Sequence, residues 1–251
     1  MRARTIASGA ALVILAGACG GSPTSPSVSL TEQLATEHFV FHYSAGDRVD
    51  SASQEAFHTW AVAELGVTPA RITYNKYTDR TQLATLTGHS PTNGYADSAV
   101  NTVYSIWPFD AHEVVHVYSG PWGFPVALFV EGLAVAYTTN PAAGDFVAKW
   151  NGTPVHTAAR QLRASGQLLP IASIAETAAF RAQNDLVTYP ESGSFVRFLI
   201  DTEGVAQMRR LYGAMPNGAS LAGVRSAFAQ VYGYSLDEAE ARWLRFLDGG
   251  V

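Results

Sequence analysis

The segment FPVALFVEGLAVAY, residues 124–137, most strongly constrains how this chain folds, because thirteen of its fourteen residues carry no charge. Segments this apolar are normally buried inside folded proteins. The one charged residue is Glu131, and burying a carboxylate among apolar side chains costs on the order of several kcal/mol unless it is paired or bound to a cation. The sequence therefore predicts that another part of the chain brings such a partner to Glu131.

A pair of histidines lies shortly before this segment, in AHEVVHVY at residues 111–118. If the stretch is a helix with Pro108 in its first turn, His112 and His116 lie one turn apart on the same face. If it is a strand, which its β-branched valines also favour, the two histidines lie about 13 Å apart and cannot bind one ion. Glu131 favours the helix, because its carboxylate needs a partner or a cation and only a helix brings the two histidines close enough to share one ion with it.

The segment that carries Glu131 is also predicted to be a helix, with Pro125 in its first turn. The turn SGPWG between the two helices is short, so they fold back as neighbours and Glu131 can face His112 and His116. Two histidines and one glutamate are typical zinc ligands, and they leave the fourth tetrahedral position open for water, as in catalytic sites. We therefore expect a reactive zinc site.

Residues 1–18 are predicted to be a signal peptide, because two arginines precede a short apolar run that ends in small residues. The run is too short to span a bilayer core of about 30 Å as a helix. The stretch LAGAC resembles the lipobox of bacterial lipoproteins, which implies lipidation of Cys19 and a lipid anchor in the membrane of the bacterial cell envelope, outside the cytoplasm. The alternative is plain secretory cleavage of the same bond, which gives a secreted protein with a free thiol.

The composition of the exported part limits its stabilisation and its partners. Cys19 is the only cysteine, so the exported domain has no internal disulfide. Without Arg2 and Arg4 the chain holds 14 basic against 21 acidic residues, which argues against nucleic acid as a partner. Residues 19–35 are rich in Gly, Ser, Pro and Thr and are predicted to be a flexible tether that leads to a folded part beginning near Thr36.

One folded domain of α+β class is predicted over residues 36–251. Residues 38–45 alternate apolar and polar side chains as a half-buried strand does, and His38 and His42 on that strand are interpreted as structural. The other predicted elements are a helix at 51–65, strands at 71–77 and 101–107, and helical segments from Pro108 onward, the last of them at 236–247.

HEVVH and VEGLAVAY together resemble the gluzincin metallopeptidases, whose pattern is H-E-x-x-H followed by a glutamate in a downstream helix. Fourteen residues separate His116 from Glu131, fewer than in thermolysin-like and aminopeptidase N-like members. The closer likeness is to the compact peptidase MA-like domains of exported bacterial proteins, which share sequence stretches similar to HFVFHYS and YPESGSFVRFL. The resemblance covers most of residues 36–248 and implies a zincin-like fold: a small N-terminal mixed sheet with a helix, then the active-site helix and a mainly helical C-terminal half.

The resemblance also implies roles for single residues. Glu113, beside the metal, would be the general base that activates the attacking water. Tyr189 matches the tyrosine that stabilises the oxyanion in aminopeptidase N-like enzymes, and its alternative role is that of an ordinary aromatic near a helix start. His156, predicted to lie in a loop, is a further candidate. Val135 stands where some relatives carry an aspartate that orients a zinc-binding histidine, so that support for the histidines is unassigned.

Residues 93–105 occupy the place where these families run an edge strand along the substrate, and a peptide could pair with that edge through its backbone. The sequence thus predicts a membrane-tethered, extracytoplasmic zinc metallopeptidase that hydrolyses peptide or protein substrates. The alternative is a non-catalytic lipoprotein that binds peptides or envelope components in the same cleft.

Overall fold

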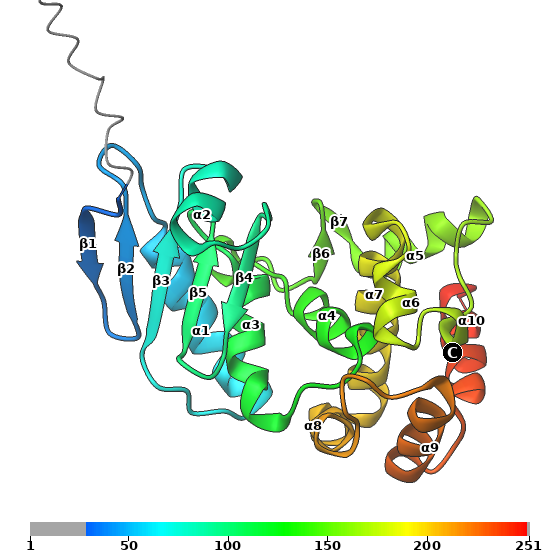
Figure 1. Ribbon diagram of the computed structural model, residues 1–251. Coiled ribbons are helices and arrows are strands. Elements are labelled where there is room, and N and C mark those ends of the chain that lie inside the picture. Colours follow the sequence, from blue (N-terminus) through cyan, green and yellow to red (C-terminus); the bar gives the residue numbers. More distant parts are fainter. Residues whose placement is uncertain (1–28, 250–251) are drawn as a thin grey trace, which may run out of the picture.

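The computed structural model describes residues 29–249, and the predicted signal peptide 1–18 and lipidation site Cys19 lie outside them. A small sheet with helices packed on it forms the N-terminal part of the described chain, and the rest is mostly helical (Figure 1), which confirms the α+β class. Within these residues, no helix has both the length and the apolar character that crossing a membrane requires.

Five strands form the N-terminal sheet in the spatial order β1-β2-β3-β5-β4. The three inner strands run parallel, and β1 and β4 pair antiparallel at the two edges. Phe39 and Phe41 are fully buried on one face of β2, as their alternation with polar neighbours predicts. The structure confirms the three predicted strands, and the strand bounds are β1 Glu32–Ala35, β2 Phe39–Tyr43, β3 Ile72–Lys76, β4 Gly94–Asp97 and β5 Thr102–Ser105.

The first edge strand corrects the predicted boundary of the tether. Residues 32–35 belong to the segment 19–35 that the sequence predicts to be flexible, but they form β1 and pair with β2 from Glu32 opposite Tyr43 to Ala35 opposite Val40. All four side chains of β1 are exposed, so the sequence carries no alternation of buried and exposed residues there. Backbone pairing with β2, rather than side-chain burial, places this strand.

Two helices cover one face of the sheet. Helix α1 (Ser51–Leu65) has the predicted bounds: the Asp50 side chain accepts a hydrogen bond from the backbone N–H of Ser53, and the chain leaves the helix at Gly66 in the left-handed conformation. Helix α3 (Ala111–Ser119) packs beside α1 and against β4 and β5. A short helix that the sequence did not predict, α2 (Arg80–Thr87), begins at an Asp79 cap and buries little apolar surface.

The C-terminal half is built around the long helix α7 (Asp185–Glu203), against which α4 (Ala127–Ala136), α5 (Val155–Ala164) and α8 (Val205–Ala214) pack. The last helix, α10 (Leu236–Leu247), has the bounds predicted from its apolar spacing. The remaining elements are the α-helices α6 (Thr177–Arg181) and α9 (Leu221–Tyr232), the 3-10 helices η1 (Gly120–Trp122), η2 (Pro141–Ala143) and η3 (Ile171–Ser173), and the short strands β6 (Lys149–Trp150) and β7 (Thr153–Pro154).

Helices α4 and α7 approach each other closely because each has a glycine at the contact. A Cβ atom added at Gly132 of α4 would lie 2.6 Å from Val196 Cγ2 and 2.9 Å from the backbone oxygen of Ser192. A Cβ added at Gly193 of α7 would overlap the side chain of Val135. Any side chain at these two positions would therefore push the helices apart.

We expect Gly132→Ala to lower the free energy of unfolding by about 1–3 kcal/mol, because the added methyl group overpacks the α4–α7 contact. Urea unfolding followed by circular dichroism measures this change. The matched control is Gly223→Ala in α9, where an added Cβ would meet its nearest atom at 3.6 Å. There, alanine should stabilise the helix by up to about 1 kcal/mol. Equal effects of the two substitutions would contradict the close-approach argument.

Candidate metal centre

The stretch with the two histidines is a helix, as the spacing predicts, but the helix begins later than expected. Its N-cap is Asp110, whose carboxylate accepts a hydrogen bond from the backbone N–H of Glu113 at 3.2 Å and another from the Ser105 hydroxyl at 2.6 Å. Pro108 lies before the helix, not in its first turn. The capping carboxylate, rather than the proline, fixes where α3 starts.

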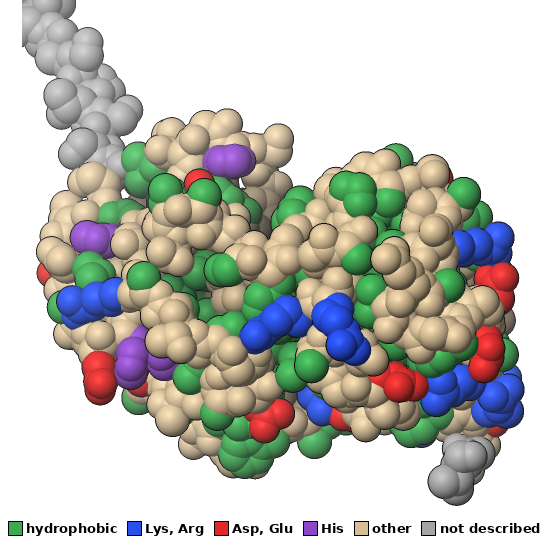
Figure 2. Space-filling view, turned by 90° about the horizontal axis from the view of Figure 1, so that it is seen from below, with side chains coloured by type: hydrophobic (Ala, Val, Ile, Leu, Met, Phe, Trp, Pro, Cys, Tyr) green, Lys and Arg blue, Asp and Glu red, His purple; other side chains and the backbone are tan. Residues whose placement is uncertain are grey.

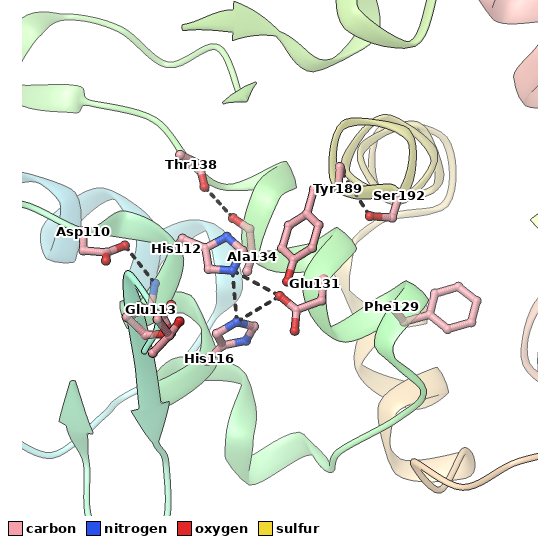
Figure 3. A network of polar contacts seen from close by, with 12 residues as sticks. Asp110, His112, Glu113, His116, Phe129, Glu131, Ala134, Thr138, Tyr189 and Ser192 are labelled. Carbon is pink, nitrogen blue, oxygen red and sulfur yellow. Dashed lines mark hydrogen bonds and ion pairs between the residues drawn. The ribbon is translucent and has the colours of Figure 1, made fainter. Parts of the chain in front are cut away.

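The two histidines face the same point from successive turns of α3. His112 Nε2 and His116 Nε2 lie 3.2 Å apart, and the two rings are nearly perpendicular with centroids 4.8 Å apart (Figure 3). Both side chains are mostly buried. The two nitrogen atoms can therefore bind the same ion.

Glu131 reaches this point from helix α4. The 3-10 helix η1 turns the chain between α3 and α4, and α4 begins at Ala127 after an extended Val126, so Pro125 lies just outside its first turn. Glu131 is only 6% exposed, and its Oε2 atom lies 3.2 Å from His112 Nε2 and 3.6 Å from His116 Nε2. The prediction that Glu131 faces both histidines is confirmed.

These three residues fit a metal ion on donor type and on spacing. Their ligand atoms, two imidazole nitrogens and one carboxylate oxygen, all lie within 4.8 Å of one another. Burial raises the pKa of Glu131, but the hydrogen bonds and charges of His112 and His116 outweigh it and hold that pKa well below its usual range. Two imidazole nitrogens and one carboxylate oxygen at this spacing could hold a divalent cation.

The atoms behind the ligands give His112 little support. Its Nδ1 atom is buried and has no hydrogen-bond partner among the described residues. Val135, one turn after Glu131 on α4, is fully buried and apolar. A metal-binding histidine usually donates its second N–H to a carboxylate or a carbonyl, and residues 29–249 provide no such group for His112.

Glu113 lies on the next position of α3, beside the edge strand β4. A Cβ atom added at Gly94 would lie 3.0 Å from Glu113 Cγ and 3.1 Å from its Oε1 atom, so the glycine leaves room for this side chain. Burial raises the pKa of Glu113 to about 8; the His112 charge opposes this rise, and the Asp110 and Glu131 carboxylates add to it. Figure 3 shows Glu113 beside the histidines, on the side away from Glu131.

Tyr189 lies in the second turn of α7, and its ring points toward His112 and Glu131 (Figure 3). The Tyr189 and His112 ring centroids are 6.0 Å apart, and the Tyr189 ring stacks on Trp150 at 4.8 Å. Its hydroxyl oxygen accepts a hydrogen bond from Arg181 at 2.9 Å. The structure therefore brings Tyr189 to the cluster, as predicted.

His156 does not join the cluster. It lies in helix α5, not in a loop, and its Nδ1 atom is 2.9 Å from the buried Ser194 hydroxyl. Its ring packs edge-on against Phe246 with the centroids 4.8 Å apart. His156 therefore stabilises the packing of α5 against α7 and α10.

Arg181, which the sequence analysis missed, completes the surroundings of Glu131. This last residue of α6 forms an ion pair with Glu131 Oε1 and a hydrogen bond with Tyr189. The stretch around it, TAAFRAQ, shows no motif, and fifty positions separate it from Glu131. No local pattern in the sequence could have identified it.

The cluster lies in an open cleft of about 950 Å³. β4 and α3 line one wall, and residues of α4, α6 and α7 line the other. Figure 2 shows the surface hollowed between the two halves of the molecule. Three large apolar side chains that are at least half exposed also line the cleft, namely Trp107, Phe124 and Leu186.

No protein-family model matches this chain, and no curated protein matches it significantly.

We expect the purified protein to bind one Zn²⁺ per chain, and His112→Ala to weaken that binding. Losing a residue that supports a metal ligand weakens metal affinity by about 10–100-fold. Losing the ligand His112 itself should weaken zinc affinity by more than that. Titration of metal-free protein against a chromophoric zinc chelator measures both affinities. The matched control is His89→Ala, because His89 lines the same cleft but lies outside the cluster. Equal affinities of parent and His112→Ala would refute the site.

Proposed function

We propose that this protein is a zinc-dependent peptidase that hydrolyses peptide bonds in the cleft between its two halves. The proposal rests on the convergence of His112, His116 and Glu131 on one point. Glu113 and Tyr189 lie beside this point (Figure 3). A zinc ion held there by His112, His116 and Glu131 would act as a Lewis acid that polarises the scissile carbonyl and lowers the pKa of water toward about 7.

Glu113 is the proposed general base. Its carboxylate follows the first histidine on the same helix, is not among the cluster's ligands and faces the cleft. In this position it would take a proton from the attacking water and pass it to the nitrogen of the leaving amine. The nearness of β4 supports this role, because a substrate beside that strand lies next to Glu113.

Tyr189 is the proposed oxyanion donor. Arg181 can only donate hydrogen bonds, so the Tyr189 oxygen accepts the bond between them. The phenolic O–H then remains free to donate to the oxygen on which negative charge develops during the attack. Its ring is held by Trp150, which limits its motion.

The edge strand β4 is the proposed site of backbone recognition. It pairs with β5 on one side only, and its residues Gly94, Tyr95 and Ala96 line the cleft. An extended peptide can add to such an edge through main-chain hydrogen bonds, which gives affinity with little preference for sequence. The substrate class is therefore peptide or unfolded protein segments.

We further propose that the protein acts outside the cytoplasm, tethered to the bacterial cell envelope by a lipid on Cys19. The apolar N-terminal run and the LAGAC stretch support this localisation. The alternative is a secreted protein cleaved at the same bond.

A second candidate function is non-catalytic binding of peptides or envelope components in the same cleft. The exposed Trp107, Phe124 and Leu186 favour it, because large apolar side chains in a cleft bind ligands whether or not a reaction follows. His112 Nδ1 has no hydrogen-bond partner in the described part of the chain, which also favours this function, since weak metal affinity would leave the cleft without its Lewis acid.

Glu113→Gln separates the two functions. We expect this variant to keep the fold and the bound zinc but to lose about 10²–10⁴-fold in kcat, because glutamine cannot accept the proton. Hydrolysis of a quenched-fluorescence peptide library, with zinc measured on the same samples, tests this. Peptide binding without hydrolysis by the parent protein would favour the binding function, and hydrolysis at the parental rate by Glu113→Gln would remove Glu113 from the mechanism.

A further inference from the structure

One guanidinium group connects the two helices that carry Glu131 and Tyr189. Arg181 Nη2 donates to Glu131 Oε1, and Arg181 Nη1 donates to the Tyr189 hydroxyl at 2.9 Å. Glu131 belongs to α4 and Tyr189 to α7, while Arg181 ends the short helix α6 that packs on α4. The planar, rigid fork of arginine fixes two partners in one geometry, which a lysine ammonium does not.

The ion pair between Arg181 and Glu131 gives the two oxygen atoms of Glu131 different partners. Oε2 lies near both histidine nitrogens, at 3.2 Å and 3.6 Å, whereas Oε1 is bonded to Arg181. A cation between the histidines would therefore meet one oxygen of Glu131, and the other oxygen is held away from it. A carboxylate without this second bond could rotate and present both oxygens.

The contact also takes the place of the support that His112 lacks among the described residues. His112 Nδ1 has no partner among the described residues, so no hydrogen bond behind the ring fixes its orientation. Arg181 is the group that fixes the third ligand instead, and its side chain is half exposed in the cleft while Glu131 is buried. Among the three ligands, Glu131 thus has a bonded neighbour behind it, whereas His112 has none among the described residues.

We propose that Arg181 is a positioning residue: it holds Glu131 with a single oxygen toward His112 and His116, and holds Tyr189 with its O–H free toward the cleft. This inference rests on the metal site of the proposed function, but it does not require that peptides be hydrolysed. It predicts that one residue outside the H-E-x-x-H motif controls both metal affinity and the geometry of the oxyanion donor.

The test compares zinc affinity in metal-free parent protein, Arg181→Met, Arg181→Lys and the control Arg225→Met. Arg225 is also about half exposed and also pairs with a carboxylate, Asp237, at 2.8 Å, but it does not line the cleft. A nearby positive charge alone would repel a cation, so its removal alone would strengthen zinc binding. We expect the opposite for Arg181→Met, an affinity about 10–100-fold weaker than that of the parent.

Arg181→Lys separates charge from geometry. It keeps the positive charge but cannot bond Glu131 and Tyr189 in one plane, so we expect zinc binding to be weakened in this variant too. Arg225→Met should bind zinc as the parent does. Affinity equal to or tighter than that of the parent in Arg181→Met would overturn the proposal, and if that variant does not fold, parental affinity in Arg181→Lys would overturn it.

A second measurement reports the coordination number of the bound metal. Co²⁺ added to the metal-free proteins gives a visible absorption whose intensity falls as the coordination number rises. We expect the parent and Arg225→Met to give the same spectrum, and the Arg181 variants to give weaker absorption because Glu131 is free to turn both oxygens to the metal. Identical spectra in all four proteins would contradict the proposed division of the Glu131 oxygens.

The outcomes distinguish this inference from the proposed function. If the parent binds zinc without hydrolysing peptides and the Arg181 variants bind it more weakly, the peptidase fails and the positioning role stands. If the parent hydrolyses peptides and the Arg181 variants bind zinc as the parent does, the positioning role fails and the peptidase stands. A parent that binds no zinc overturns both.

Discussion

The burial of the Glu131 carboxylate in the otherwise apolar helix α4 is the constraint on which the site depends. Moving this charge out of water is costly, and the chain offsets the cost with three partners from two other helices, His112, His116 and Arg181. Helix α3 holds both histidines and helix α6 holds Arg181, so the contacts of this carboxylate tie α3, α4 and α6 together. The proposed metal site is a consequence of that arrangement.

Close packing of the helical half keeps the second wall of the cleft in place. The glycines Gly132 and Gly193 let α4 and α7 touch, and this contact places Tyr189 opposite the histidines of α3. The other wall depends on the sheet, where Gly94 on the edge strand leaves room for Glu113. These glycines thus allow the close contacts beside Tyr189 and Glu113, and both side chains line the cleft.

Local spacing explains which parts of this arrangement the sequence could predict. The four-residue interval of His112 and His116 and the isolated charge of Glu131 are local signals, and the structure confirms the contact they predicted. Arg181 gives no such signal, because only the tertiary fold brings α6 to α4 across fifty positions. The same holds for β1, whose exposed residues 32–35 are ordered by pairing with β2, and for the start of α3, which the Asp110 cap decides.

An anomalous difference map, recorded at the zinc absorption edge from crystals of the protein grown with zinc, would show whether a metal ion binds between these helices. We expect one strong peak per chain, at about 2.0–2.2 Å from His112 Nε2, His116 Nε2 and a single oxygen of Glu131. Arg181 should remain bonded to the other oxygen. A map with no peak between these residues, or with its peak at other residues, would show that His112, His116 and Glu131 do not form a zinc site.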